Sequence, residues 1–216
     1  MELLFPRNNF LESKNTYGVW LSGGADSSIL TYLLLKHIIE NDLPYKLQPV
    51  SVRKYDNNMD HHLKVAQWLR DYFSTDILLP VDDNLKDTGT FSEINQRNIL
   101  DNKYSYIFSG ITSAPPNKEF TDDWDHVLEL ENIRGEHAKK LLVFSGVIEQ
   151  NSKLYEFGDI RPLYNLNKKN IAELYEKYNL TSTLFPVTNS CVAPVDGKHC
   201  SNCWFCNERK WAFGRI

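Results

Sequence analysis

One segment of this 216-residue chain sets its architecture, and it reads Tyr17-Gly18-Val19-Trp20-Leu21-Ser22-Gly23-Gly24-Ala25-Asp26-Ser27-Ser28. Residues 17–21 are apolar and rich in β-formers, which predicts a buried strand. Residues 29–39 are apolar at helical spacing and predict a helix. A strand that enters a helix through a tight glycine turn is the opening unit of an α/β protein.

The glycine turn itself predicts a phosphate site, because it presents backbone N–H groups and a helix N-terminus to an anion. Two glycines let the backbone approach the phosphate closely, and three serine hydroxyls add donors. A carboxylate beside phosphates makes sense as a ligand of Mg²⁺. The simpler interpretation is a Gly-Gly turn with an Asp or Ser N-cap, but the flanking strand and helix favour a nucleotide site. Its predicted members are Leu21, Ser22, Gly23, Gly24, Ala25, Asp26, Ser27 and Ser28.

No Gly-Lys-Ser/Thr follows the glycines at Walker A spacing, so transfer of the γ-phosphoryl group is disfavoured. Further along, the pattern repeats as strand and helix in alternation, which predicts a parallel sheet covered on both faces. Residues 112–140 are polar and long for a connection, which makes them a candidate substrate loop. Predicted strands cover 46–52, 76–81 and 104–111, and predicted helices cover 62–73, 91–102 and 168–178, the last capped by Asn167.

All four cysteines lie within residues 191–206, in the pattern C-x8-C-x2-C-x2-C. A single buried cysteine is ordinary core, but four thiolates at this spacing complete a tetrahedral shell around Zn²⁺ and leave no position open for chemistry. We therefore expect a structural zinc ion that holds a C-terminal segment, 189–216, against an α/β domain over 1–188. The predicted ligands are Cys191, Cys200, Cys203 and Cys206.

The charge balance and the apolar stretches of the sequence argue against nucleic acid and membranes as partners. The 24 Lys and Arg residues against 28 Asp and Glu give a formal charge of −4, without the basic excess typical of nucleic-acid binding. The longest apolar stretch, 29–35, is too short to cross a bilayer, and the N-terminus lacks the features of a signal peptide. A cytoplasmic location is expected, and its reducing conditions favour a metal over disulfides at the cysteines.

The loop Ser22-Gly23-Gly24-Ala25-Asp26-Ser27 resembles the pyrophosphatase loop of the PP-loop ATP-pyrophosphatase superfamily. Together with the C-x8-C-x2-C-x2-C pattern and the following Arg209, it resembles the 7-cyano-7-deazaguanine synthases of queuosine biosynthesis. Two shorter matches lie between, Ser109-Gly110-Ile111 at a strand end and the stretch from Pro162 to Lys168 before the last helix. The middle departs from the family: residues 91–98 lack its Val-Pro-Gly, and Thr112-Ser113-Ala114-Pro115-Pro116 replaces residues expected near the substrate.

The resemblance implies an α/β sandwich of the PP-loop type, with a parallel sheet of about five strands. It also implies an ATP-dependent carbon–nitrogen ligase. Its substrates would be ATP with Mg²⁺, 7-carboxy-7-deazaguanine and ammonia, and its products AMP, pyrophosphate and the amide or nitrile. A homodimer is compatible with it. The resemblance adds Gly110 to the nucleotide-binding set, and Arg209 to the groups that could spread the pyrophosphate charge. Its implied catalytic residues are Asp26, Ser27, Lys168 and Arg97.

Other interpretations stay open. A PP-loop enzyme acting on another carboxylate, a nucleobase or tRNA would keep the loop and the cysteines while changing the middle of the chain. A phosphoadenylyl-sulfate reductase is disfavoured, because it needs a reactive cysteine outside the metal shell. A zinc module that binds nucleic acid through its basic tail is disfavoured by the acidic balance. His61 and His62 are expected to be solvated, and the aromatic residues of the tail to pack it in place.

Overall fold

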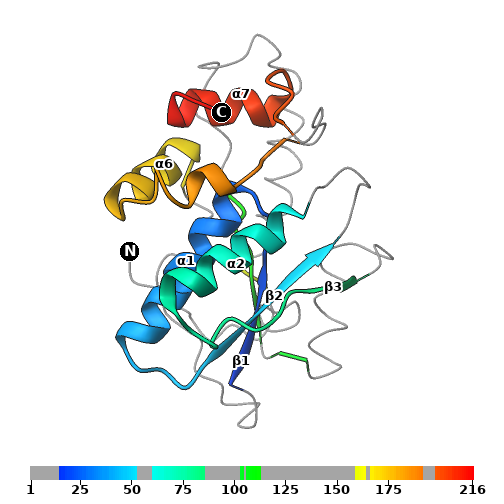
Figure 1. The fold of residues 1–216 in the computed structure, drawn as a ribbon, viewed down its shortest axis with the longest axis vertical. Helices are drawn as coiled ribbons and strands as arrows, with labels where there is room; N and C mark the ends of the chain where they lie inside the picture. Colours follow the sequence, from blue (N-terminus) through cyan, green and yellow to red (C-terminus); the bar gives the residue numbers. More distant parts are fainter. Residues whose placement is uncertain are drawn as a thin grey trace.

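The computed structural model describes residues 15–52, 60–85, 103–104, 106–112, 159–163, 166–191 and 198–216. Strands and helices alternate along the first half of this part of the chain, and three helical segments close it (Figure 1). The elements are β1 (Thr16–Trp20), α1 (Ala25–Glu40), β2 (Lys46–Val52), α2 (His61–Phe73), β3 (Asp82–Leu85), β4 (Ile107–Phe108), β5 (Asp159–Ile160), α6 (Lys168–Lys177), the 3-10 helix η1 (Phe185–Val187) and α7 (Trp204–Phe213).

The five strands form one sheet in the order β3-β2-β1-β4-β5, and every neighbouring pair is parallel. The predicted parallel α/β architecture is therefore confirmed. The chain moves in one direction from β1 to β2 to β3, so right-handed crossovers put α1 and α2 on the same face of the sheet. Figure 1 shows these two helices next to each other, and they are in contact.

Helix α1 is the centre of the core. Eleven of its sixteen residues are buried, including the continuous run from Ser27 to Leu35. A helix that is buried on nearly every side must be covered by other elements as well as by the sheet. Here α6 supplies part of that cover, since Tyr175 is fully buried and donates a hydrogen bond from its hydroxyl to the Ala25 carbonyl oxygen at 2.9 Å. The start of α1 is thereby held by a helix about 150 residues further along the chain.

The predicted helix at 168–178 is also confirmed. Asn167 caps α6, accepting hydrogen bonds at its side-chain oxygen from the backbone N–H groups of Lys169 and Asn170. The Asn170 side chain in turn accepts from the Asn167 N–H, which completes a capping box. This local geometry fixes where α6 begins, and it places Lys168 in the first turn.

Two predicted strands have the wrong bounds. Residues 76–81 pair with β2 only through an isolated bridge between Leu47 and Leu78, and β3 begins at Asp82, after Pro80. Proline has no N–H to donate, so the ladder is interrupted there. The strand predicted at 104–111 is limited to Ile107 and Phe108. The predicted helix 91–102 and nearly all of the candidate substrate loop 112–140 lie outside the described residues.

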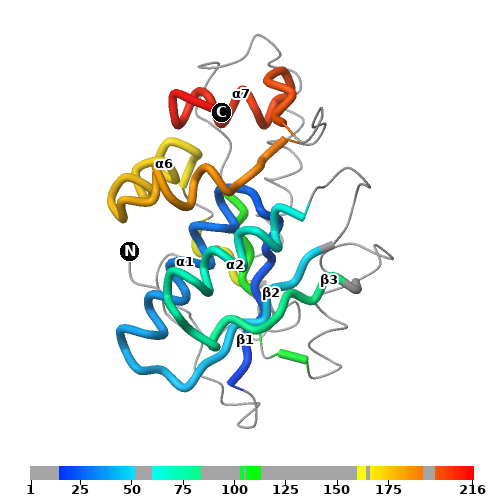
Figure 2. Tube along the Cα trace, viewed as in Figure 1, coloured from blue at the N-terminus to red at the C-terminus, as the bar shows by residue number. Residues whose placement is uncertain are grey.

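The C-terminal helices lie together at the end of the molecule where α1 begins (Figure 2). Phe213 of α7 stacks on Phe185 of η1 with ring centroids 4.1 Å apart, and Tyr175 of α6 meets both rings edge-on. Neither η1 nor α7 was among the predicted elements. Their position brings the cysteine-bearing segment to the carboxyl end of β1, where ligands bind in open parallel sheets.

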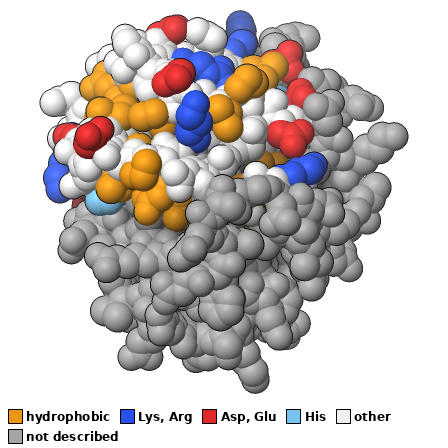
Figure 3. All heavy atoms as spheres, turned by 90° about the horizontal axis from the view of Figure 1, so that it is seen from below, with side chains coloured by type: hydrophobic (Ala, Val, Ile, Leu, Met, Phe, Trp, Pro, Cys, Tyr) orange, Lys and Arg blue, Asp and Glu red, His pale blue; other side chains and the backbone are white. Residues whose placement is uncertain are grey.

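Within the described residues, no helix combines the length and apolarity that a bilayer crossing needs. Figure 3 shows one face of the molecule, and the described part of that face carries hydrophobic side chains interspersed with both acidic and basic ones.

Candidate functional site

The glycine turn links β1 to α1 and has the conformation expected for an anion-binding loop. Gly23 has φ of +81°, a left-handed conformation that favours glycine. A Cβ atom at Gly23 would also lie 2.7 Å from the backbone nitrogen of His62, so the start of α2 packs directly on the turn. Gly24 is the N-cap of α1 and has no side chain to occupy the helix N-terminus, which leaves the first N–H groups of α1 directed beyond it.

The serine hydroxyls of the turn bond mainly to the turn itself. The Ser22 and Ser27 hydroxyl oxygens are 3.0 Å apart, and Ser27 also donates to the Gly24 carbonyl oxygen at 3.2 Å. Ser28 is fully buried and donates to the same carbonyl at 2.7 Å. These bonds pre-organise the loop, and they make the Ser28 hydroxyl a support of the turn and not a donor to a ligand.

Two further predicted residues lie against the loop. A Cβ atom on Gly110, just beyond β4, would lie 2.8 Å from the Ser27 nitrogen, so only glycine allows this close approach. Leu21 is buried and donates its N–H to the Val50 carbonyl oxygen at 2.9 Å, which ties the loop to β2. Arg97, the remaining predicted catalytic residue, lies outside the described residues.

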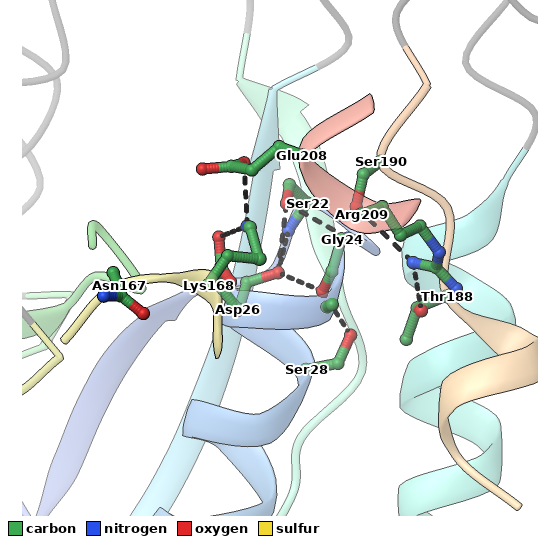
Figure 4. A network of polar contacts seen from close by, with 12 residues as sticks. Ser22, Gly24, Asp26, Ser28, Asn167, Lys168, Thr188, Ser190, Glu208 and Arg209 are labelled. Carbon is green, nitrogen blue, oxygen red and sulfur yellow. Dashed lines mark hydrogen bonds and ion pairs between the residues drawn. The ribbon is translucent and has the colours of Figure 1, made fainter. Parts of the chain in front are cut away.

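A buried ion-pair network connects the loop to both C-terminal helices (Figure 4). The Lys168 ammonium group on α6 pairs with the Asp26 carboxylate of the loop and lies 3.4 Å from an oxygen of Glu208 on α7. Lys168 is 5% exposed and Glu208 1% exposed. Lys168 is therefore not the solvated residue that a lysine at a helix start usually is, and Glu208 is a member of the site that the sequence did not single out.

Arg209 is buried, and its guanidinium bonds mainly to η1 and the residue that follows it. It is 2% exposed, and its guanidinium donates to the Thr188 hydroxyl at 2.8 Å and to the Phe185 carbonyl oxygen at 3.0 Å. It also lies 3.8 Å from the centroid of the Phe185 ring. Burial lowers the pKa of Arg209 to about 10, which leaves it charged at neutral pH. In this structure Arg209 braces α7 against η1, and the expectation that it spreads pyrophosphate charge stays a prediction.

Arg209→Ala should therefore lower the free energy of unfolding by about 2–4 kcal/mol, because it removes two buried hydrogen bonds from a charged donor and the contact with the Phe185 ring. Urea denaturation of the variant measures this loss. Lys210→Ala is the matched control, since Lys210 is the next residue of α7 and is exposed. Equal stabilities of the two variants would contradict the bracing role.

The four cysteines come together as the sequence predicts. Their sulfur atoms all lie within 4.8 Å of one another, and the sulfurs of Cys200 and Cys206 are 4.0 Å apart. Thiolates that share one tetrahedral Zn²⁺ at about 2.3 Å lie about 3.8 Å apart. In a [4Fe–4S] cluster each thiolate binds a different iron atom, so the sulfurs are spread more widely. The compact group fits a single ion better than a cluster.

Hydrogen bonds to the sulfurs also fit metal-bound thiolates. The Cys203 N–H donates to the Cys200 sulfur, and the Cys200 N–H donates to the Cys191 sulfur, both at 3.3 Å. Backbone N–H groups of Asn202 and Cys203 lower the pKa of the Cys200 thiol to about 6. Such donors compensate the negative charge that four thiolates bring together.

Asn189 joins the cysteine group to the glycine turn. Its N–H donates to the Gly23 carbonyl oxygen at 2.8 Å, and its side-chain oxygen accepts from the Cys191 N–H at 2.8 Å. Its amide nitrogen lies 3.0 Å from Nε2 of His61. The loop, the cysteine group and the start of α2 are thus linked through the backbone and side chain of one residue, Asn189.

The two histidines are not solvated as expected. His62 is 4% exposed, and His61 is partly buried beside the turn. Burial lowers the pKa of His61, because it disfavours the charged form of the ring. The sequence analysis missed this because the contact depends on where α2 docks.

Comparison with known proteins finds a family model that matches part of the chain and solved structures that are similar in fold. Residues 137–216 match the family model described as queuosine biosynthesis protein QueC. No curated protein matches the sequence. The U34-tRNA thiolase NcsA from Methanococcus maripaludis, solved with its [4Fe-4S] cluster, is similar in fold: the TM-score is 0.50, the sequence identity 18%, and the match covers 94% of this chain and 66% of the thiolase.

The thiolase is therefore the longer protein, and this chain spans about two thirds of it. PH1313 from Pyrococcus horikoshii Ot3 is matched at 15% identity and a TM-score of 0.39, over 76% of this chain and 42% of that one.

Proposed function

We propose that the chain is a QueC-like member of the PP-loop family and an ATP-dependent ligase that activates a carboxylate by adenylation, since residues 137–216 match the QueC family model and the fold is similar to that of the tRNA thiolase. The observation that carries the proposal is the pairing of Lys168 with Asp26 at the start of α1. The N-terminus of α1, the backbone N–H groups of the glycine turn and the buried lysine ammonium group together provide the positive potential that a bound pyrophosphate requires.

The position of Lys168 supports a functional role over a structural one. It lies in the first turn of α6, where the helix dipole disfavours a cation, and it is almost fully buried. Both effects cost free energy that a solvated lysine avoids. A phosphate-binding cation at the loop explains why a charge is kept at such a place.

The proposed reaction follows from these groups and from the family. The substrate carboxylate attacks the α-phosphorus of ATP, and the bond to the β-phosphate oxygen breaks, which gives an acyl-adenylate and pyrophosphate. Ammonia then attacks the acyl carbon, AMP leaves, and a proton is lost to give the amide. The amide oxygen then attacks the α-phosphorus of a second ATP, which releases a second pyrophosphate. Loss of AMP and of both amide protons gives the nitrile. No protein nucleophile takes part in any of these steps.

The chain's own residues would supply orientation and charge. The N–H groups at the start of α1 and the Lys168 ammonium group hold the departing pyrophosphate. Asp26 has one buried carboxylate oxygen without a hydrogen-bond partner among the described residues, and 22% of its side chain is exposed. This oxygen fits a ligand of Mg²⁺, which when bound would neutralise phosphate charge.

We further propose that Cys191, Cys200, Cys203 and Cys206 hold one structural Zn²⁺ ion. Four thiolates leave no position for water or substrate, so the ion would stabilise the segment around it and take no part in the chemistry. The compact spacing of the sulfurs supports zinc over an iron–sulfur cluster.

We propose 7-carboxy-7-deazaguanine as the carboxylate, from the family match over residues 137–216. Incubation with ATP, Mg²⁺, ammonium and this compound should yield AMP, pyrophosphate and the amide or nitrile, identified by mass spectrometry. Asp26→Asn, which keeps the shape of the side chain and removes its charge, should depress this activity strongly. ADP as the main product would contradict adenylation, whereas AMP formation with another carboxylate alone would contradict only the substrate.

A further inference from the structure

Lys168 is held between two carboxylates that come from opposite ends of the chain. Asp26 belongs to the glycine turn, and Glu208 belongs to α7, 182 residues later, as Figure 4 shows. Glu208 lies two residues after the cysteine ligand Cys206 on the same helix, whose N-cap is the ligand Cys203. Glu208 is thus placed by the metal-binding segment, while the group it contacts belongs to the nucleotide site.

We propose that Glu208 is a positioning residue for the nucleotide site, which holds the Lys168 ammonium group where it can meet the pyrophosphate of ATP. The effect of Glu208 on ATP binding rests on the proposed function. The positioning of Lys168 by Glu208 can be tested without ATP.

Geometry and charge both point to this role. Lys168 has a long side chain with several rotatable bonds, and ordering it costs conformational entropy that two anchors share. A single pairing with Asp26 would leave the ammonium group engaged with the very carboxylate that is the candidate Mg²⁺ ligand. Glu208, at 3.4 Å, gives Lys168 a second partner that can keep it in place when Asp26 turns to the metal.

Glu208 is buried, which is unusual for a carboxylate unless it pairs with a cation. It is 1% exposed, and a buried carboxylate needs a cation to offset the loss of hydration. Its neighbour Arg209 is bonded to Thr188 and to the Phe185 carbonyl oxygen. The Lys168 ammonium group lies at salt-bridge distance from Glu208, 3.4 Å, and so supplies a cation.

The first test measures how well Lys168 is held. An amine-acetylating reagent, with peptide mass spectrometry over time, reports the labelling rate of Lys168 against that of the exposed Lys169 in the same molecule. Glu208→Ala should speed the labelling of Lys168 about tenfold, and Glu208→Gln should speed it less, because the amide oxygen still accepts a hydrogen bond. Glu176→Ala is the control, since Glu176 is exposed on α6. An unchanged rate in Glu208→Ala would overturn the positioning role.

The second test connects this to the nucleotide. Equilibrium binding of ATP and of pyrophosphate should weaken about tenfold in Glu208→Ala, and AMP binding should not change, because only the pyrophosphate meets Lys168. In a Lys168→Met background, Glu208→Gln should cause no further weakening. Tighter ATP binding by both Glu208 variants would overturn the proposal, because Glu208 would then only repel the phosphates.

Two controls separate the possible failures. Metal content of the Glu208 variants, measured by elemental analysis, should equal that of the wild type, and variants that lose metal would count against a role limited to Lys168. Wild-type protein that binds neither ATP nor pyrophosphate would overturn the proposed function instead. The labelling rates would still decide whether Glu208 holds Lys168.

Discussion

Lys168→Met should lower kcat/KM for ATP by about 10²–10³-fold, the size of effect seen when one pre-organised group that stabilises a developing anion is removed. Methionine keeps much of the length and the apolar stem of lysine, so the change removes mainly the charge. We expect the rate of pyrophosphate release to fall, because negative charge develops on the pyrophosphate as its bond to the α-phosphorus breaks. The assay measures pyrophosphate release at several ATP concentrations with the carboxylate saturating.

The control for this variant is Lys169→Met. Lys169 is the next residue of α6 and is exposed, with its ammonium group 4.5 Å from the centroid of the Trp211 ring. We expect its kcat/KM to stay within about threefold of the wild type.

Stability must be measured beside activity, because Lys168→Met leaves Asp26 and Glu208 near each other without the ammonium group that pairs with both. Removing one partner of a buried ion pair is costly. Thermal unfolding and AMP binding show whether the variant is folded. A folded Lys168→Met protein with nearly wild-type kcat/KM would mean that Lys168 does not meet the phosphates.

Cys203→Ser should lower the free energy of unfolding by about 3 kcal/mol or more, because the energy of binding a structural metal is part of the folding energy. For a chain of this length, that corresponds to a fall in Tm of about 6–12 °C. The bound metal should also fall below one ion per chain. Both are measured on the purified protein, by thermal unfolding and elemental analysis.

Asn202→Ala is the matched control for the cysteine variant. Asn202 lies in the same turn, is exposed, and contributes its backbone N–H to Cys200, which the substitution retains. A strong chelator should destabilise the wild type and the control equally, and should have little further effect on Cys203→Ser. A Cys203→Ser protein with wild-type Tm and full metal content would contradict the four-cysteine site.

Removal of the metal also tests the link that Asn189 makes between the cysteine segment and the glycine turn. Asn189 bonds both the Cys191 N–H and the Gly23 carbonyl oxygen, so loss of the ion should loosen the glycine turn as well as the tail. This geometry gives a physical reason for the proposed structural metal to lie next to the proposed nucleotide loop.

Much of this protein could be predicted from local sequence patterns. The turn from Ser22 to Ser28, the helix cap at Asn167 and the four cysteines were all found this way, because each depends on residues close together in the chain. A glycine's freedom at positive φ, an amide that caps the next turn, and thiolates at metal-ligand spacing are local properties. The alternation of strands and helices then determined a parallel sheet, since that pattern has few other solutions.

Only the tertiary structure decided which distant side chains meet. Lys168 looks like an ordinary solvated lysine until α6 docks on α1, and Glu208 looks like an ordinary helix glutamate until α7 docks beside it. Arg209 was expected at the phosphates, and in the structure its guanidinium bonds to Phe185 and Thr188. The free-energy cost of burying a charged side chain depends on its partners, and these lie far away in the chain. The local sequence therefore could not show that Arg209 would contact η1 while Lys168 would contact the glycine turn.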